Sequence, residues 1–274
     1  MSNKRDALGD RMKNYENVTR IYLEPKKPII VRIDGRAFHT YTKGFIKPFD
    51  DIMIASMEKT LQTLCEEVGG VLFGYTQSDE ITLVLGDWQK ENTQSFFNGN
   101  ILKIASVTAS IATLAFNKAI IEEVHKAEQS GIDISRYKKA LNMTATFDSR
   151  CFNLPFEEVI NCCIWRQQDA IRNSKQAVGY ANFSYKETFG LNCDELVEKL
   201  KEEKGIIWNE FPIYQQRGIL CEKVDVTEEI SYIHKKTGEK NTSIVTRHKW
   251  VLNHNMPLFS DDRNKFEKML LNAI

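Results

Sequence analysis

The order of strands and helices in the first 155 residues is the feature that most restricts the fold of this chain. The stretch KPIIVRI (27–33) is rich in β-branched residues and predicts a strand. The helix expected over 50–70 has its apolar residues on one face, a cap at Asp50 or Asp51, and Gly69-Gly70 at its end. The elements expected next are two strands, a long helix and a last strand, over 71–75, 80–85, 93–128 and 142–152. This β-α-β-β-α-β order predicts an α+β protein with a ferredoxin-like antiparallel sheet that carries helices on one face.

The second half of the chain is expected to be helical first and then to form strands. The expected elements are helices over 156–181 and 192–204, strands over 206–208 and 218–224, and a polar hairpin around KKTGEKN. Asn192 is a favourable cap for the second helix. No internal repeat or low-complexity linker separates the halves. We therefore predict a core over 1–155 and an extension over 156–274 packed on it, within a single continuous domain.

Composition excludes a general attraction to nucleic acid. The 274 residues include 37 basic and 37 acidic side chains, so the formal net charge is zero and any surface that binds nucleic acid must be local. Six cysteines form no C-x-x-C pair and no signal peptide is present, which favours free thiols in a reducing cytoplasm. Lysines and polar residues interrupt the longest apolar stretches, so we expect no membrane association.

One local basic segment is a candidate for contact with nucleic acid. The stretch IHKKTGEKNTSIVTRHKW (233–250) has five Lys or Arg residues against one Glu, together with two histidines and a tryptophan. Such a segment could contact an RNA backbone, and it could equally be a solvated surface.

Carboxylates that are distant in sequence are expected to meet at one edge of the sheet. Asp34 follows the apolar run Ile29–Ile33, and taken alone this Asp-Gly pair is a common turn signal. In a ferredoxin-like sheet, however, the first and third strands are antiparallel neighbours, which places Asp34 beside Asp79 and Glu80. Like charges at this spacing repel unless a cation lies between them, and oxygen ligands favour Mg²⁺. A pair of such ions can support nucleotidyl transfer, which makes a metal-nucleotide site the better interpretation.

The same segments carry a family resemblance. The motifs RIDGRAFH, KPFDD, GYTQSDEITLV, FDSR, WRQQD and KGIIWNEFPIYQQRG occur in this order over residues 10–222. With them the chain resembles the tRNA(His) guanylyltransferase family. The resemblance implies a palm similar to that of polymerases and nucleotide cyclases, and addition of nucleotides in the 3′→5′ direction to the 5′ end of tRNA. It also implies GTP and ATP as substrates, two Mg²⁺ ions and a homotetramer.

The resemblance assigns roles to particular residues. It implies that Asp34, Asp79 and Glu80 are catalytic, and that Asp34, Asp79 and the carbonyl of Gly35 hold the metal ions. The implied nucleotide-binding residues are Asp34, Gly35, Arg36, Ala37, Phe38, His39, Lys47, Ser78, Asp79 and Lys103. The residues expected to handle the tRNA end or the activated intermediate are Arg150, Arg166, Lys204, Asn209 and Arg217. Without the resemblance, Lys103 and each of these basic residues would be read as a solvated or salt-bridging surface residue.

One departure from the family pattern bears on the substrate. Where tRNA(His)-specific enzymes have a His-Ile-Asn-Asn run after WRQ-D, this chain has WRQQDAIRNSKQ, so Ile171 replaces the histidine and only Asn173 is retained. We therefore predict the Thg-like branch, which repairs 5′-truncated tRNA by template-directed addition. The alternatives are a strict tRNA(His) guanylyltransferase, a nucleotide cyclase, and a tRNA-binding module without catalysis.

Overall fold

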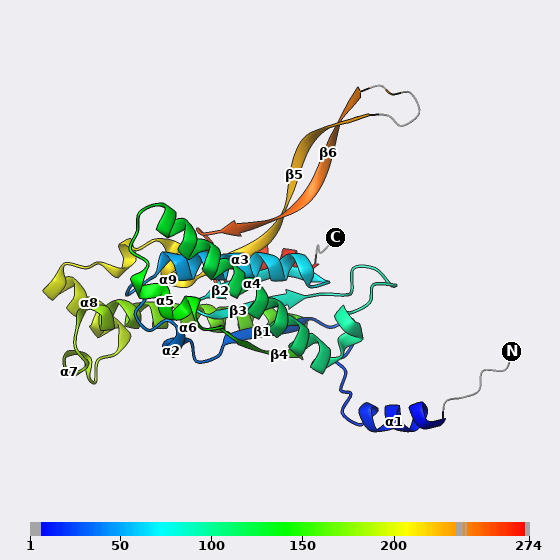
Figure 1. Cartoon of the computed structure of the whole chain (residues 1–274), viewed down its shortest axis with the longest axis horizontal. Coiled ribbons are helices and arrows are strands. Elements are labelled where there is room, and N and C mark those ends of the chain that lie inside the picture. The colour runs from blue at the N-terminus through cyan, green and yellow to red at the C-terminus, as the bar shows by residue number, and fades with distance from the viewer. Residues whose placement is uncertain (1–6, 234–237, 239, 272–274) are drawn as a thin grey trace.

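The computed structural model describes residues 7–233, 238 and 240–271 and is built around one antiparallel sheet (Figure 1). Its six strands lie in the order β4-β1-β3-β2-β5-β6. They are β1 (Ile29–Gly35), β2 (Val71–Gln77), β3 (Glu80–Leu85), β4 (Phe147–Asn153), β5 (Ile219–Ile233) and β6 (Lys240–Asn253). The first four have the order 4-1-3-2, and the predicted ferredoxin-like fold is therefore confirmed.

The register of the central strands follows from alternating side chains. On β1, Ile29, Val31 and Ile33 face one side of the sheet and are buried with residues of β3 in the largest apolar cluster. Asp34 extends β1 beyond the expected end and is paired with Glu80 of β3 and with Asp148 of β4. The alternation therefore places the side chains of Arg32 and Asp34 on the opposite side from that cluster.

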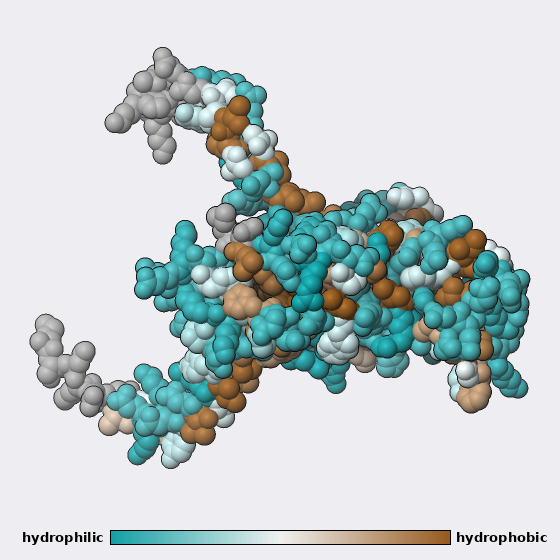
Figure 2. All heavy atoms as spheres, turned by 180° about the vertical axis from the view of Figure 1, so that it is seen from behind, coloured by the Kyte–Doolittle hydropathy of each residue, from teal (hydrophilic) through white to brown (hydrophobic). Residues whose placement is uncertain are grey.

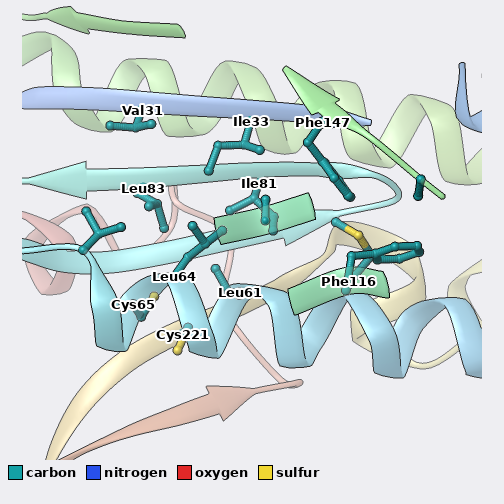
Figure 3. Close-up of a cluster of buried hydrophobic side chains, with 14 of the residues drawn as sticks. Val31, Ile33, Leu61, Leu64, Cys65, Ile81, Leu83, Phe116, Phe147 and Cys221 are labelled. Carbon is teal, nitrogen blue, oxygen red and sulfur yellow. The ribbon is translucent and has the colours of Figure 1, made fainter. Parts of the chain in front are cut away.

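Two helices, α3 (Asp51–Glu67) and α4 (Ile101–Gln129), cover the first face of the sheet. Figure 3 shows Leu61 and Leu64 of α3 below Ile81 and Leu83 of β3, with Phe116 from α4 beside Phe147 of β4. The Asp50 side chain accepts the N–H of Met53 and so caps α3, as one of the two predicted alternatives. Asn100 caps α4 in the same way, so this helix begins eight residues later than predicted.

The second face of the sheet is covered by α6 (Phe156–Asn182) and α10 (Arg263–Leu271). Val159, Ile160 and Cys163 of α6 pack with Ile30 of β1, and Phe266 of α10 packs against Phe73 of β2. The prediction of helices on one face of the sheet therefore holds only for the helices of the first half of the chain, α3 and α4. The extension supplies the other layer, because β1, β3 and β2 present apolar side chains on both faces.

The extension also lengthens the sheet and then leaves it. β5 pairs with β2 only from Ile219 to Glu222, and its remainder pairs with β6 as a long hairpin that projects from the body (Figures 1 and 2). The expected strand over 218–224 is therefore the start of a much longer one, and the expected strand over 206–208 is wrong, because only a short 3₁₀ helix begins there. The turn predicted at KKTGEKN lies mostly outside the described residues.

The remaining elements are short or peripheral. They are α1 (Ala7–Asn17), α2 (Phe38–Tyr41), η1 (Phe96–Gly99), η2 (Ser135–Tyr137), α5 (Lys138–Leu141), α7 (Tyr185–Thr188), α8 (Cys193–Lys204), η3 (Trp208–Glu210) and α9 (Ile213–Arg217). The side chain of Asn192 accepts backbone N–H groups of α8, as predicted. Of the helices that the structure describes, α4 is long and apolar enough to cross a membrane by length and composition. One side of α4 is buried in the protein core, which accounts for that composition.

Candidate nucleotidyl-transfer site

The two predicted metal-binding aspartates meet at the end of the sheet. Asp34 is the penultimate residue of β1, and Asp79 lies in the two-residue turn that joins β2 to β3. The N–H of Gly35 donates to the carbonyl of Asp79 at 3.1 Å, which ties the two segments together. Burial raises the pKa of the Asp79 carboxyl, and the Asp34 carboxylate raises it further against a hydrogen bond from Ser78. The fold therefore holds two carboxylates close enough to repel each other.

Glu80, the third predicted catalytic carboxylate, is held in a buried ion pair. Its two oxygens accept hydrogen bonds from Arg166 Nε and Nη2 at 2.6 and 2.7 Å, and Arg32 Nε lies 3.6 Å away. Arg166 also donates to Asp169 at 2.9 Å and is only 5% exposed. Paired on both sides and buried, Arg166 does not fit the predicted contact with tRNA. It fixes the carboxylate of Glu80 instead.

The donor atoms fit a magnesium site of the expected kind. Within residues 7–233, 238 and 240–271, no group of three or more His, Cys, Asp and Glu side chains converges as a metal cage. Two carboxylates, from Asp34 and Asp79, and the carbonyl of Gly35 leave most positions of an octahedral ion to water and phosphate, which is the usual manner of Mg²⁺ binding. Two neighbouring carboxylates repel each other, and a divalent cation between them would offset that repulsion.

A cavity of about 500 Å³ opens beside these carboxylates. Its walls come from the segment 35–54, the turn between β2 and β3, the middle of α6 and the residues of α9. The predicted nucleotide-binding residues that line it are Gly35, Ala37, Phe38, His39, Lys47, Ser78 and Asp79. Asp34 precedes this wall directly, whereas Arg36 is exposed and lies outside it.

The structure corrects the prediction for Lys103. The hydroxyl of Thr113 accepts the N–H of Phe147 at the end of β4 that lies beside Gly35. The carbonyl of Ile101, by contrast, accepts from Cys151 near the other end of the same strand. Lys103 is one turn or less from Ile101, so it belongs to the end of the sheet away from the aspartates, where its ammonium lies 5.9 Å from the ring of Phe97. It therefore does not reach the cavity within this chain.

Close packing fixes the loop that follows β1. A β-carbon on Gly35 would lie 2.3 Å from Cδ2 of Phe38, so only glycine allows the Phe38 ring to fold back under the loop. That ring is buried against Phe116 and Phe147, so the predicted nucleotide-binding role of Phe38 is limited to shaping the wall. Ala37 and Ser78 both have positive φ, at 54° and 51°, which is a strained backbone that often marks functional sites.

We expect Gly35→Ala to weaken nucleotide binding and to lower the free energy of unfolding by roughly 1–3 kcal/mol, as overpacking typically does. The added methyl group must displace the Phe38 ring and with it the loop. Nucleotide binding and urea unfolding measure both effects. Gly69→Ala is the matched control, because its β-carbon would come only within 3.3 Å of the Phe96 ring. Equal effects of both substitutions would contradict this role of Gly35.

The far wall of the cavity contains residues that the sequence did not identify. Asn173 and Ser174 of α6 line it together with Gln215 and Gln216 of α9. The Ser174 hydroxyl donates to the carbonyl of Gln215 at 2.7 Å and joins the two helices. Gly218 has a φ of 88°, and a β-carbon there would lie 2.5 Å from the carbonyl oxygen of Thr76. The sequence signal for this wall was the polar run YQQRG (214–218). Two adjacent glutamines followed by a glycine at a close backbone approach are suited to a buried polar wall.

The other residues predicted to contact tRNA are dispersed around the site. Arg150 is exposed on β4 and pairs with Asp148 at 2.9 Å. Lys204 ends α8 with its ammonium 5.3 Å from the ring of Phe183, and Asn209 is exposed in η3. Arg217 adjoins the cavity wall, and its Nε is buried with no hydrogen-bond partner among the described residues. Arg150, Lys204 and Asn209 are exposed to solvent, and contact of all four residues with tRNA stays a prediction.

The basic segment 233–250 is balanced by the strand beside it. β5 contributes Glu222, Asp225, Glu228 and Glu229 to the hairpin, and these residues were outside the segment considered in the sequence. Lys249 pairs with Glu228 across the hairpin, and His248 pairs with Asp225 at 2.5 Å. The hairpin is therefore nearly neutral as a whole, which weakens the argument for RNA contact from charge alone.

Two neighbouring aspartates at the end of a ferredoxin-like sheet, beside a cavity of about 500 Å³, are the arrangement of a nucleotidyltransferase of the palm type. The family model described as tRNAHis guanylyltransferase matches residues 9–155, which is more than half of the chain. The chain belongs to the tRNA(His) guanylyltransferase family, and the resemblance in its motifs is confirmed.

Individual relatives agree with this assignment. An uncharacterised protein of Acanthamoeba polyphaga mimivirus is 30% identical over 231 residues, which cover 80% of this chain and 77% of that protein. A probable tRNA(His) guanylyltransferase of Dictyostelium discoideum is 28% identical over 77% of this chain and 79% of its own length. Among solved structures, a bacterial tRNA(His) guanylyltransferase-like protein in complex with ATP is 39% identical, covers 96% of this chain and 98% of its own, and has a TM-score of 0.79. A complex with GTP under the same description has 38% identity, coverage of 97% and 99%, and a TM-score of 0.74.

Proposed function

We propose that this protein adds nucleotides in the 3′→5′ direction to the 5′ end of tRNA, with GTP and ATP as substrates. The observation that carries the proposal is the meeting of Asp34 and Asp79 at the mouth of the cavity lined by the loop after β1. The solved relatives in complex with ATP and with GTP support a nucleotide as the occupant of that cavity. We also propose a cytoplasmic location and a homotetramer, as expected from the free thiols and the family resemblance.

The residues of the site suit two successive transfers at one place. In the first, a 5′-monophosphate oxygen of the tRNA attacks the α-phosphorus of ATP, and pyrophosphate leaves. In the second, the 3′-hydroxyl of an incoming GTP attacks the activated 5′-phosphorus, AMP leaves, and the hydroxyl proton passes to solvent. Bound Mg²⁺ at Asp34, Asp79 and the Gly35 carbonyl would supply charge neutralisation for both. Lys47 at the cavity wall offers a cation for the phosphates, while Arg166 orients the carboxylate of Glu80.

Ile171 supports template-directed repair over strict tRNA(His) recognition. Its side chain packs against the apolar cluster of Val178, Leu196 and Leu200, beneath the lobe formed by α7 and α8. An aliphatic residue in that position offers no hydrogen bond to a particular base. We propose that the opposing 3′ strand selects the nucleotide instead.

We expect the protein to extend tRNAs of several identities that lack their first nucleotide, when the opposing base matches the nucleotide supplied. The test uses 5′-labelled transcripts with a matched or mismatched opposing base, together with full-length tRNA(His). Extension only with the matched base supports repair, whereas preference for full-length tRNA(His) with any opposing base refutes it. Formation of a cyclic nucleotide without RNA extension would show a cyclase and overturn the whole proposal.

A further inference from the structure

The face of the sheet beneath α6 carries two rows of like charges. Asp34 of β1 is opposite Asp148 of β4, and two residues along the strands Arg32 is opposite Arg150. All four side chains share one face, because side chains of a strand alternate between faces. Like charges directly opposite each other are unfavourable, and the ion pairs of Asp148 with Arg150 and of Arg32 with Glu80 only partly offset this. A cation over the aspartate row and an anion over the arginine row would satisfy both.

Trp165 of α6 lies against Arg32, one of the two arginines of that row. Its ring centroid is 4.5 Å from Cζ of Arg166 and 5.5 Å from Cζ of Arg32. Both guanidinium groups belong to the ion-pair group of Glu80, so they approach the indole from the side of the sheet and hold it in place. The tryptophan is nevertheless 51% exposed and belongs to none of the three apolar clusters formed by the described residues.

The surface around Trp165 is open, whereas the cavity is enclosed, and this difference indicates which ligand each would bind. The cavity is walled by four segments and fits one nucleotide, whereas Trp165 and the neighbouring Arg150 and Asp148 are open to solvent beside the edge strand β4. A free nucleotide would be bound more completely in the cavity. An open surface with an aromatic ring and a cation suits the end of a polymer, which must enter from solvent.

We propose that Trp165, Arg32 and Arg150 form a shelf that receives the 5′-terminal nucleotide of the RNA. The base stacks on the indole, and the terminal phosphate lies beside Arg150, about 7 Å along the strand from the Asp34 row. The aspartates then lie between the RNA end on the shelf and the nucleotide in the cavity. The inference rests on the proposed function, and it adds Trp165 and Arg32 as RNA-binding residues.

The test combines a protein change with an RNA change at the same contact. Wild type, Trp165→Ala and Trp165→Phe are compared with a tRNA transcript whose 5′-phosphorylated first nucleotide is either intact or abasic. Binding is titrated directly, and addition is followed with excess enzyme. Tyr180→Ala is the matched control, because Tyr180 is an exposed aromatic residue on α6, about 22 Å further along the helix.

We expect Trp165→Ala to raise the dissociation constant of the intact RNA by about tenfold or more, as loss of one stacked base does. For wild type, removing the first base of the RNA should weaken binding by the same factor as Trp165→Ala does. For Trp165→Ala, removing that base should cause no further loss. Trp165→Phe should restore most of the affinity, Tyr180→Ala should change nothing, and half-saturation by GTP should stay constant throughout.

Two results would overturn the shelf. Losses that multiply when both changes are combined would show that the ring and the base do not touch, and a change in GTP half-saturation would place Trp165 at the cavity. Because binding is measured apart from addition, failure of wild type to extend any RNA would refute the proposed function alone. A loss of affinity in Trp165→Ala that is seen with the intact RNA and not with the abasic RNA would still support the shelf.

Discussion

Asp34→Ala and Asp79→Ala should each reduce nucleotide addition by on the order of 10³-fold or more while leaving the fold intact. Each substitution removes one of the two carboxylates that we propose as Mg²⁺ ligands, and a divalent ion bound there would supply several kcal/mol of charge stabilisation to the transition state. Single-turnover addition to 5′-truncated tRNA with Mg²⁺ measures the loss. Asp10→Ala, at an exposed aspartate of α1, is the control.

Stability should change in the opposite direction to activity. Burial and the Asp34 carboxylate raise the pKa of Asp79, so the folded protein binds this proton more tightly than the unfolded chain does. The stability associated with that proton is present at low pH and falls as the pH rises through the raised pKa. Without metal, Asp79→Asn should therefore raise the unfolding temperature at neutral pH and have little effect below the ordinary pKa. Wild-type rates in either alanine variant would refute the metal assignment.

Arg166→Ala should lower the free energy of unfolding by about 3–5 kcal/mol, because the buried Glu80 carboxylate loses both hydrogen bonds from Arg166 and keeps only Arg32, whose Nε is 3.6 Å away. Urea unfolding at neutral pH measures the loss. The double variant Glu80→Gln with Arg166→Met should be less destabilised than Arg166→Ala, since the buried carboxylate is removed together with its main partner. A stability equal to wild type in Arg166→Ala would contradict the structural role of Arg166 and favour the original prediction that it contacts tRNA.

The sequence was sufficient for the fold of the first half and for the meeting of Asp34 with Asp79. The order of elements permits few sheets, and in a ferredoxin-like sheet the end of the first strand must lie beside the start of the third. The apolar run Ile29–Ile33 was enough to predict a buried strand that ends at Asp34. Local signals and topology agreed there, so the prediction needed no knowledge of distant contacts.

Where the prediction failed, the missing information was a pairing between distant segments. Nothing near Arg166 in sequence shows that its charge is used by Glu80, and a helical pattern for α4 gives its buried face but not which end of the sheet Lys103 reaches. The basic count over 233–250 covered one strand of a hairpin and not the acidic strand beside it. Trp165 was overlooked for a similar reason, because its exposure depends on how α6 crosses the sheet.

The cavity has a consequence for how the chain can be divided. Its walls combine the loop after β1 with α6 and α9, and Glu80 of the first half is neutralised by Arg166 of the second. The segment 9–155 that carries the family pattern is therefore not a portable module. Cut at that boundary, it would keep both aspartates yet lose one side of the substrate chamber, the counter-ion of a buried acid and the cover of a whole sheet face. Shuffling among relatives would have to exchange the two parts together.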